Sequence, residues 1–377
     1  MKKRNDYIFT KCFAVFSCFI LILSFCLYYS AAGFSAKNLL SAAEEIYTGN
    51  EGEEGGFFGA GDDIADDGSP DGTDIIDAYI EEAEQNRPSD SGSGYETPQD
   101  IIALMADAEK TVSDAKKKGK ITERTYTSKD STNTYKNVSV RNATSQKIDV
   151  KAVLNSKLGL KVPDNPKPAV LIFHTHTSES FMLTNADFYS DSFPTNSFKN
   201  SRNMVRIGEE IAGKLEEARI SVIHDTVLHD EKYTGAYDHS RKTAKEYLKK
   251  YPSVKVCLDV HRDSIQLKSG TRIKPAAEIG GKKAAQIMII TGAEEGKIKD
   301  FPNWETNLNF AVKLQNKAET MYRGLMKPIF FAPRKYNMDL TPYSLLLEIG
   351  SDANTIEEAV YSAGLIGEVL AGFLQEF

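Results

Sequence analysis

Beyond Pro163, short apolar runs alternate with longer segments in which apolar residues recur at spacings of three and four. The short runs are typical of buried strands and the longer segments of amphipathic helices. Their alternation predicts an α/β fold, a mostly parallel twisted sheet with helices on both faces. The predicted strands are 169–173, 220–224, 254–260, 286–291, 329–332 and 345–349, and the predicted helices are 203–218, 239–250, 306–323 and 355–375. Residues 135–160 could add edge strands and a helix.

An apolar run from Cys12 to Ala32 has the length that a bilayer requires, and basic residues precede it. Because basic flanks stay on the cytoplasmic side, residues 1–34 are predicted as a cytoplasmic tip and a transmembrane helix. The chain would then be a single-pass protein of the cell membrane, with a cytoplasmic N-terminus and an extracytoplasmic remainder. Ser30–Ala32 also resembles a signal-peptide cleavage site, so removal of the segment is the alternative.

Residues 35–130 are predicted to be an acidic, flexible linker. Between Glu44 and Asp100, Arg87 is the only basic residue among many carboxylates and glycines, so this part has too little apolar surface to fold alone. Helical spacing at 74–84 and 98–118 indicates short amphipathic helices within it. Residues 131–377 are predicted to form the extracytoplasmic catalytic domain.

Composition excludes two kinds of site. The formal net charge of -7 comes largely from the acidic linker, and no basic stripe with interleaved aromatic residues occurs, so nucleic acid is not the expected partner. Cys12, Cys18 and Cys26 all lie in the apolar run, which leaves Cys257 alone in the folded part. Without a Cys-x-x-Cys pair, a thiolate zinc site is excluded.

Candidate chemistry gathers at the carboxyl ends of predicted strands, where α/β folds place their active sites. His174 and His176 follow strand 169–173, and His261 follows strand 254–260. Glu348 lies in the same way on strand 345–349. One histidine at a strand end is more often a core or loop residue, but two such strand ends with glutamates nearby favour function.

The residue types suit a hydrolytic zinc site. Such a site takes three nitrogen or oxygen ligands and leaves one position for water, whose pKa falls to about 7 on the metal. His176, Glu179 and His261 could supply the three ligands. Glu348 is the candidate catalytic base, because a carboxylate between apolar strand neighbours is costly unless it is paired or used.

Several further polar residues are weaker candidates for a supporting or substrate-binding role. Arg262 and Asp263 could orient His261 or the substrate, and surface ion pairing is an equally good explanation for them. The others lie in loops that could contact substrate, and they are His229, Asp230, Arg334 and Asn337.

Five short motifs occur in order along residues 165–377, and together they are specific. They are His174–Glu179 (HTHTSE), His229-Asp230, Asp259–Asp263 (DVHRD), Arg334–Asn337 (RKYN) and Leu347–Gly350 (LEIG). With these motifs the chain resembles the stage II sporulation protein P family, the engulfment peptidoglycan hydrolases of endospore-forming bacteria. The apolar anchor and acidic linker also fit that family's layout.

The resemblance implies an amidase-like fold, related to the zinc N-acetylmuramoyl-L-alanine amidases. By strand order it places the two histidine ligands at His176 and His261 and the catalytic glutamate at Glu348. The middle ligand departs from the amidase pattern, because the helix that should supply it begins Asn200–Met204 without a carboxylate. Glu179 is the expected substitute and His174 the alternative. Met338 also stands where the resemblance would place a glutamine.

The resemblance further implies Zn²⁺ as cofactor and peptidoglycan as substrate. It implies cleavage between muramic acid and L-alanine, and of the peptide cross-links, in septal wall remodelling and engulfment during sporulation. The implied partners are a stage II sporulation protein D-like transglycosylase and a stage II sporulation protein M-like membrane scaffold. Two other readings are a tethered wall-binding or scaffold module without activity and a metallophosphoesterase, which would need more carboxylates at the site.

Overall fold

The computed structural model describes residues 95–377. The predicted anchor (1–34) and the first part of the predicted linker (35–94) lie outside the described residues. Among residues 95–377, no helix is both long and apolar enough to span a membrane.

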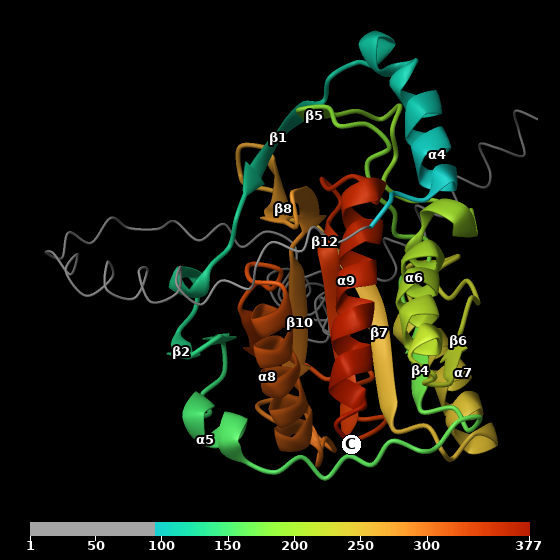
Figure 1. Cartoon of the computed structure of the whole chain (residues 1–377). Helices are drawn as coiled ribbons and strands as arrows, with labels where there is room; N and C mark the ends of the chain where they lie inside the picture. Colours follow the sequence, from blue (N-terminus) through green and yellow to red (C-terminus); the bar gives the residue numbers. More distant parts are fainter. Residues whose placement is uncertain (1–94) are drawn as a thin grey trace, which may run out of the picture. The chain divides into compact units, whose positions relative to one another are not determined.

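An eight-stranded sheet forms the centre of the domain, in the order β2-β3-β11-β10-β12-β7-β4-β6 (Figure 1). The pairs β2–β3 and β10–β12 are antiparallel and the others are parallel, so the predicted α/β class is confirmed as a mixed sheet in which parallel pairs predominate. Its strands are β2 (Asn133–Tyr135), β3 (Val138–Asn142), β4 (Val170–Phe173), β6 (Val222–His224), β7 (Val256–Asp263), β10 (Ile287–Gly292), β11 (Ile329–Ala332) and β12 (Tyr343–Ser351).

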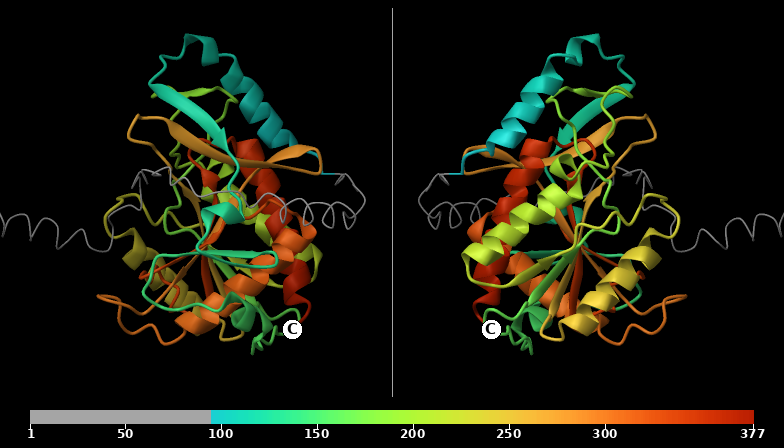
Figure 2. Two further views of the ribbon diagram at one scale, coloured as in Figure 1. Left: turned by 90° about the vertical axis from the view of Figure 1, so that its left-hand side faces the viewer. Right: turned by 90° about the vertical axis from the view of Figure 1, so that its right-hand side faces the viewer.

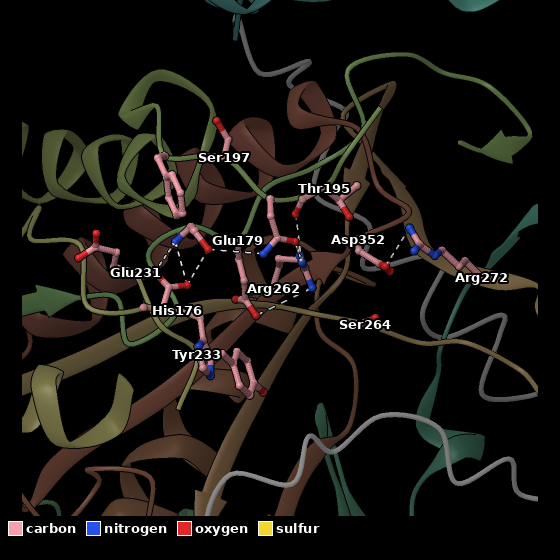
Figure 3. A pocket seen from close by; sticks show the side chains of 14 residues that line it. His176, Glu179, Thr195, Ser197, Glu231, Tyr233, Arg262, Ser264, Arg272 and Asp352 are labelled. Carbon is pink, nitrogen blue, oxygen red and sulfur yellow. Dashed lines mark hydrogen bonds and ion pairs between the residues drawn. The ribbon is translucent and has the colours of Figure 1, made fainter. Parts of the chain in front are cut away.

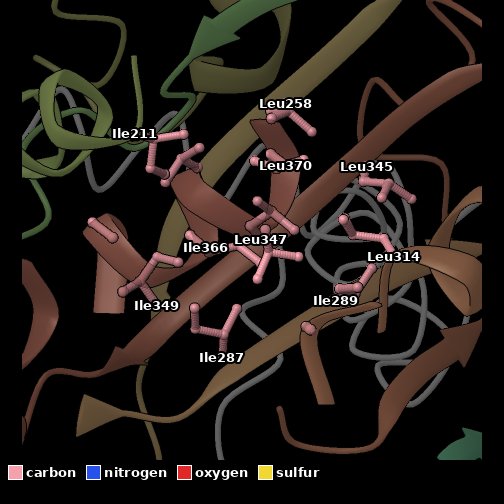
Figure 4. Close-up of a cluster of buried hydrophobic side chains, with 14 of the residues drawn as sticks. Ile211, Leu258, Ile287, Ile289, Leu314, Leu345, Leu347, Ile349, Ile366 and Leu370 are labelled. Atoms are coloured by element: carbon pink, nitrogen blue, oxygen red, sulfur yellow. The ribbon is translucent and has the colours of Figure 1, made fainter. Parts of the chain in front are cut away.

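Helices cover both faces of this sheet, as predicted. On one face lie α6 (Met204–Glu217), α8 (Trp304–Met321) and α9 (Ile356–Leu374), with the short α5 (Val150–Asn155) beside α8. Figure 4 shows the core on this face, where Leu347 of β12 lies close to Ile366 of α9. The opposite face carries α7 (Ala236–Lys250) (Figure 2). Its Ala244 belongs to one buried cluster with Leu171 and Phe173 of β4.

A second sheet of four strands has the order β5-β1-β8-β9. It consists of β1 (Gly119–Arg124), β5 (Phe188–Tyr189), β8 (Arg272–Ile279) and β9 (Lys282–Ala285), and α4 (Gln99–Glu109) precedes it along the chain. Single turns of 3₁₀ helix occur at η1 (Val112–Asp114), η2 (Ser128–Asp130) and η3 (Asn200–Arg202).

These elements correct the predicted start of the folded domain at residue 131. Ile101 of α4 is fully buried in the main core, and β1 pairs in parallel with β8, so residues 95–130 are part of the fold. The predicted amphipathic helix within 98–118 is confirmed as α4. The linker prediction erred here because β1 contains one buried residue, Ile121, and finds its partner strand some 150 residues later in the chain.

Strand alternation decides which side chains meet at the site. Cys257 of β7 packs on the α7 face, so Asp259 and His261 point to that face too. On β12, Leu346 packs on the same face, and Glu348 follows it two residues later. Because β7 and β12 are parallel neighbours with His261 opposite Glu348, both side chains emerge side by side.

Gly350, at the end of β12, has a backbone conformation that an L-residue resists, with φ at 63°. A Cβ there would lie 2.6 Å from Asn354 Oδ1 and 2.8 Å from the Ala285 Cβ. We expect Gly350→Ala to lower the free energy of unfolding by about 2–4 kcal/mol, measured by urea denaturation. Gly213→Ala on α6 is the matched control: nothing lies within 4 Å of its Cβ, and it should raise stability by about 0.5–1 kcal/mol. Equal effects at the two positions would contradict this account.

Candidate functional site

The loop after β4 carries two of the predicted ligands and is buried along its length. It turns tightly, with the Glu179 amide donating to the His176 carbonyl at 3.1 Å. Asp230 accepts hydrogen bonds from the Ser178 amide at 3.0 Å and the Ser178 hydroxyl at 2.7 Å. His229 Nδ1 lies 3.0 Å from the His174 carbonyl oxygen. His229 and Asp230 therefore hold the shape of this loop, a positioning role rather than a direct substrate contact for His229.

The structure brings the three predicted ligands, His176, Glu179 and His261, close together. We call this group of three residues the corner. The rings of His176 and His261 have centroids 5.3 Å apart and stand edge to face. His261 Nδ1 lies 3.6 Å from Glu179 Oε2. The Nδ1 atom of His176 is buried and has no hydrogen-bond partner. Within residues 95–377, however, no three His, Cys, Asp or Glu side chains are already arranged as a metal-binding group.

Asp259 lies against the His261 ring and holds its orientation. Its Oδ1 lies 2.7 Å from His261 Nε2, the distance of a buried ion pair when the imidazole is protonated. The carboxylate itself is held by the Thr175 amide at 2.9 Å and the Thr175 hydroxyl at 2.6 Å. Burial lowers the pKa of His261, but the Asp259 and Glu179 carboxylates more than offset it, so the pKa lies well above its ordinary value.

His174, the alternative ligand, points away from this corner. Strand alternation continues from Val170 and Ile172 and places its ring on the α6 face of the sheet. There Nδ1 lies 2.9 Å from the Val260 carbonyl oxygen and Nε2 lies 3.0 Å from His224 Nε2. Burial and the neighbouring His224 lower the pKa of His174 to about 3.

Glu348 stands beside His261, as the strand register requires. The residue is partly exposed, but its Oε2 atom is buried without a hydrogen-bond partner. Burial, and then the negative charge of Asp263, raise the pKa of Glu348 to about 8. Asp263 is itself paired with Lys327 Nζ at 3.0 Å in the interior. Asp263 therefore forms an ion pair next to Glu348, and its role in orienting His261 or the substrate stays a prediction.

Arg262 is buried and fully engaged by the protein. Its amide donates to Glu179 Oε2 at 3.2 Å, and its guanidinium donates to the carbonyls of Ser180 and Thr195, each at 3.1 Å. Burial raises the pKa of Glu179, but Arg262 and the two histidines outweigh it and bring the pKa down to about 2. Glu179 is accordingly an anion facing the histidines.

A pocket of about 640 Å³ opens from this corner (Figure 3). It is lined by His176, Ser178, Glu179, Thr195, Asn196, Ser197, Phe198, Asp230, Glu231, Tyr233, Arg262, Ser264, Arg272 and Asp352. Tyr233 is half-exposed and stacks on His176 with ring centroids 4.8 Å apart. The pocket therefore has two of the predicted ligands, His176 and Glu179, in the same wall as Arg262, Arg272 and Asp352.

Comparison with known families settles the relationship of the chain. The model of stage II sporulation protein P (SpoIIP) matches residues 79–371. The chain belongs to the stage II sporulation protein P family. It is 28% identical over 217 residues to stage II sporulation protein P of Bacillus subtilis (strain 168), a match that covers 54% of this chain and 51% of that protein. The chain thus spans about half the length of this curated relative, and the resemblance predicted from the motifs is confirmed.

Among solved structures, this stage II sporulation protein P family member is similar to N-acetylmuramoyl-L-alanine amidases. The CwlD amidase from Clostridioides difficile, in complex with the GerS lipoprotein, is 11% identical with a TM-score of 0.37, covering 55% of this chain and 100% of that one. AmiC2 of Nostoc punctiforme is 11% identical with a TM-score of 0.33, covering 55% and 96%. Because both TM-scores are below 0.5, nothing about activity follows from these similarities.

Two residues of the stage II sporulation protein P family motif RKYN do not line the pocket. Asn337 donates to the Ser240 hydroxyl at 3.0 Å and accepts from Arg241 at 3.1 Å, so it ties its loop to α7. The Arg334 guanidinium lies 5.9 Å from the Tyr336 ring centroid. The predicted substrate contacts of Arg334 and Asn337 are therefore not seen among the pocket-lining residues.

Sequence reasoning missed several residues of the site. Tyr237 lies edge-on to His176, with centroids 5.6 Å apart, and stacks on Tyr336 at 5.1 Å. Arg272 and Asp352 line the far end of the pocket. Tyr237 begins α7 and carries no spacing signal, whereas Asp352 follows Glu348 closely enough that the end of β12 could have pointed to it.

Proposed function

We propose that this chain is a peptidoglycan hydrolase of sporulation that acts as a zinc-dependent N-acetylmuramoyl-L-alanine amidase and also cleaves peptide cross-links. The observation that carries the proposal is the meeting of His176, Glu179 and His261 at one corner, with Glu348 in register beside His261. Membership of the stage II sporulation protein P family supports peptidoglycan as the substrate.

The donor chemistry of the corner fits zinc. Two imidazoles and one carboxylate form a common hydrolytic ligand set. His176 Nδ1 is a buried nitrogen without a hydrogen bond, and such an atom is costly unless a ligand satisfies it. Zinc–nitrogen bonds are about 2.0–2.1 Å long, so His176, Glu179 and His261 must draw together to hold the ion. When bound, zinc supplies an acidified water and polarises the scissile carbonyl.

The protein's own groups perform the remaining steps. Glu348 takes a proton from the attacking water and passes it to the nitrogen of the leaving amine. Asp259 holds the His261 ring in place, and Asp230 holds the loop that carries His176 and Glu179. The pocket positions the stem peptide so that its first amide lies at the corner.

The cellular setting belongs to the same proposal. Residues 1–34 anchor the chain in the membrane with the catalytic domain outside, and residues 35–94 form the acidic tether. The chain acts in septal wall remodelling and engulfment together with a stage II sporulation protein D-like transglycosylase and a stage II sporulation protein M-like membrane scaffold.

The test is release of fragments from purified sacculi by the full-length chain in detergent, identified by mass spectrometry. We expect free stem peptides that begin at L-alanine, lost on chelation and restored by zinc. Cross-linked peptide fragments of known structure, used as substrates and identified in the same way, would report cleavage of the cross-links. Binding to sacculi without release, even with zinc and transglycosylase-treated glycan, would overturn the amidase.

One observation favours a second candidate, a wall-binding or scaffold module without activity. The described residues 95–377 present no group of three metal-binding side chains already in place. A scaffold would bind sacculi equally well when Glu348 is replaced.

A further inference from the structure

The far end of the pocket contains a charged pair that the proposed reaction does not use. Arg272, at the start of β8, places Nη1 3.1 Å from Asp352 Oδ2, just beyond β12. The Arg272 guanidinium also lies 4.0 Å from the Tyr189 ring centroid, which holds it from the other side. Figure 3 shows Arg272 and Asp352 at one end of the pocket and His176 and Tyr233 toward the other, with Glu179 and Arg262 between them.

Both members of this pair keep unused binding capacity. Asp352 is 3% exposed, and its Oδ1 is buried without a hydrogen-bond partner. A guanidinium has five N–H donors, and a single contact to a carboxylate, through Nη1, involves Arg272 in the described part of the chain. Arg262, the other cation of the pocket lining, already donates to Ser180 and Thr195.

The unused N–H donors of Arg272 and the unpaired Oδ1 atom of Asp352 carry opposite charge and belong to neighbouring side chains. A ligand carboxylate alone would gain from Arg272 but would be repelled by Asp352, and an ammonium alone would meet the reverse. A group that carries a carboxylate and an ammonium on the same carbon satisfies both. Such charge-assisted hydrogen bonds are roughly twice as strong as neutral ones, and a planar guanidinium binds a carboxylate with two of its donors.

We propose that Arg272 and Asp352 form a subsite for a zwitterionic amino-acid end of the stem peptide, its carboxylate on Arg272 and its ammonium on Asp352 Oδ1. The inference rests on the proposed function, because it takes the stem peptide as the ligand. The stem peptide would then lie along the pocket, with its first amide at His176 and its charged end at Arg272 of β8.

Binding to two synthetic muramyl tripeptides tests this subsite. One ends in a diamino acid whose distal carbon keeps a free ammonium and carboxylate, and in the other both groups are blocked by acetylation and amidation. Titration calorimetry uses the full-length chain in detergent, with Glu348→Gln present throughout to prevent turnover. We expect about 10- to 100-fold tighter binding of the free peptide, since each tenfold step corresponds to about 1.4 kcal/mol.

Arg272→Met and Asp352→Asn should each weaken binding of the free peptide to the level of the blocked one and leave the blocked peptide unchanged. Arg272→Lys should retain part of the preference for the free peptide. Lys268→Met, an exposed change in the loop between β7 and β8, should retain all of it. Equal affinity of the Glu348→Gln chain for both peptides, or an equal loss for both when Arg272→Met is added, would overturn the subsite. If the preference holds while the chain without Glu348→Gln releases no stem peptide from sacculi, the subsite stands and the amidase is overturned.

Discussion

Replacing Glu348 by glutamine should abolish hydrolysis while leaving the fold and the zinc in place. A positioned general base typically contributes about 10²–10⁴-fold to rate, so we expect release of stem peptides from sacculi to fall by at least about 100-fold. Glutamine keeps the shape of the side chain but cannot accept the proton. The loss should appear in turnover, measured by mass spectrometry of the released peptides.

The position of Glu348 explains why a small change has a large effect. It lies opposite His261 on the neighbouring strand, and its Oε2 is buried without a partner. Burial raises its pKa to about 8, so a cation at the histidine corner would be needed to ionise it at neutral pH. Because glutamine removes a group that is costly to bury as an anion, thermal stability should not decrease.

Two comparisons separate the roles open to Glu348. Glu357→Gln, an exposed change on α9 that keeps an acceptor oxygen for the Thr97 hydroxyl, should keep full activity. If Glu348→Gln lost zinc together with activity, Glu348 would be a ligand and not the base. If it hydrolysed sacculi at the parent rate, the assignment of Glu348 as base would be wrong.

The central fold was predictable because its strands are buried on both faces. Runs such as Val170–Phe173 and Ile329–Ala332 are entirely apolar, and buried strands of this kind stand out from their surroundings. The last helix was equally clear, since Thr355 and Glu358 form a capping box at its start. The predicted bounds of these elements agree with the structure to within a few residues.

The second sheet escaped prediction because its strands are short of apolar residues and pair across long distances. In β8, Lys274 and Glu278 interrupt the pattern, and Lys274 is buried only because it pairs with Glu358. Such an ion pair joins residues on separate elements, and no local spacing reports it. Arg272, at the start of β8, was missed for the same reason.

The site was predictable to the extent that strand order determines it. The strand-end rule brought His176 and His261 together correctly, and the register of β7 with β12 added Glu348. Strand alternation alone would have placed His174 on the α6 face. The roles of His229 and Asn337 could not be read from sequence, because their hydrogen bonds go to the β4 loop and to α7, which are distant in the chain.

The purified full-length chain should bind one zinc ion, and His176→Ala and His261→Ala should each lose it. Mutating a group that merely supports a ligand costs about 10–100-fold in metal affinity, so removal of a ligand should cost at least about 100-fold. Competition with a chromophoric chelator measures the affinity, and this readout does not depend on hydrolysis. His239→Ala is the matched control, since His239 is exposed and outside the corner.

Glu179→Gln and His174→Ala then identify the third ligand. Glu179 faces His261 Nδ1 at 3.6 Å as an anion, whereas His174 is turned toward His224 on the other face of the sheet. We therefore expect Glu179→Gln to lose zinc and His174→Ala to keep it. The opposite result would require the β4 loop to turn over on binding. A parent chain without zinc affinity would remove the metal from the proposed function altogether, because the corner would then be a pair of histidines balanced by Glu179 and Asp259 alone.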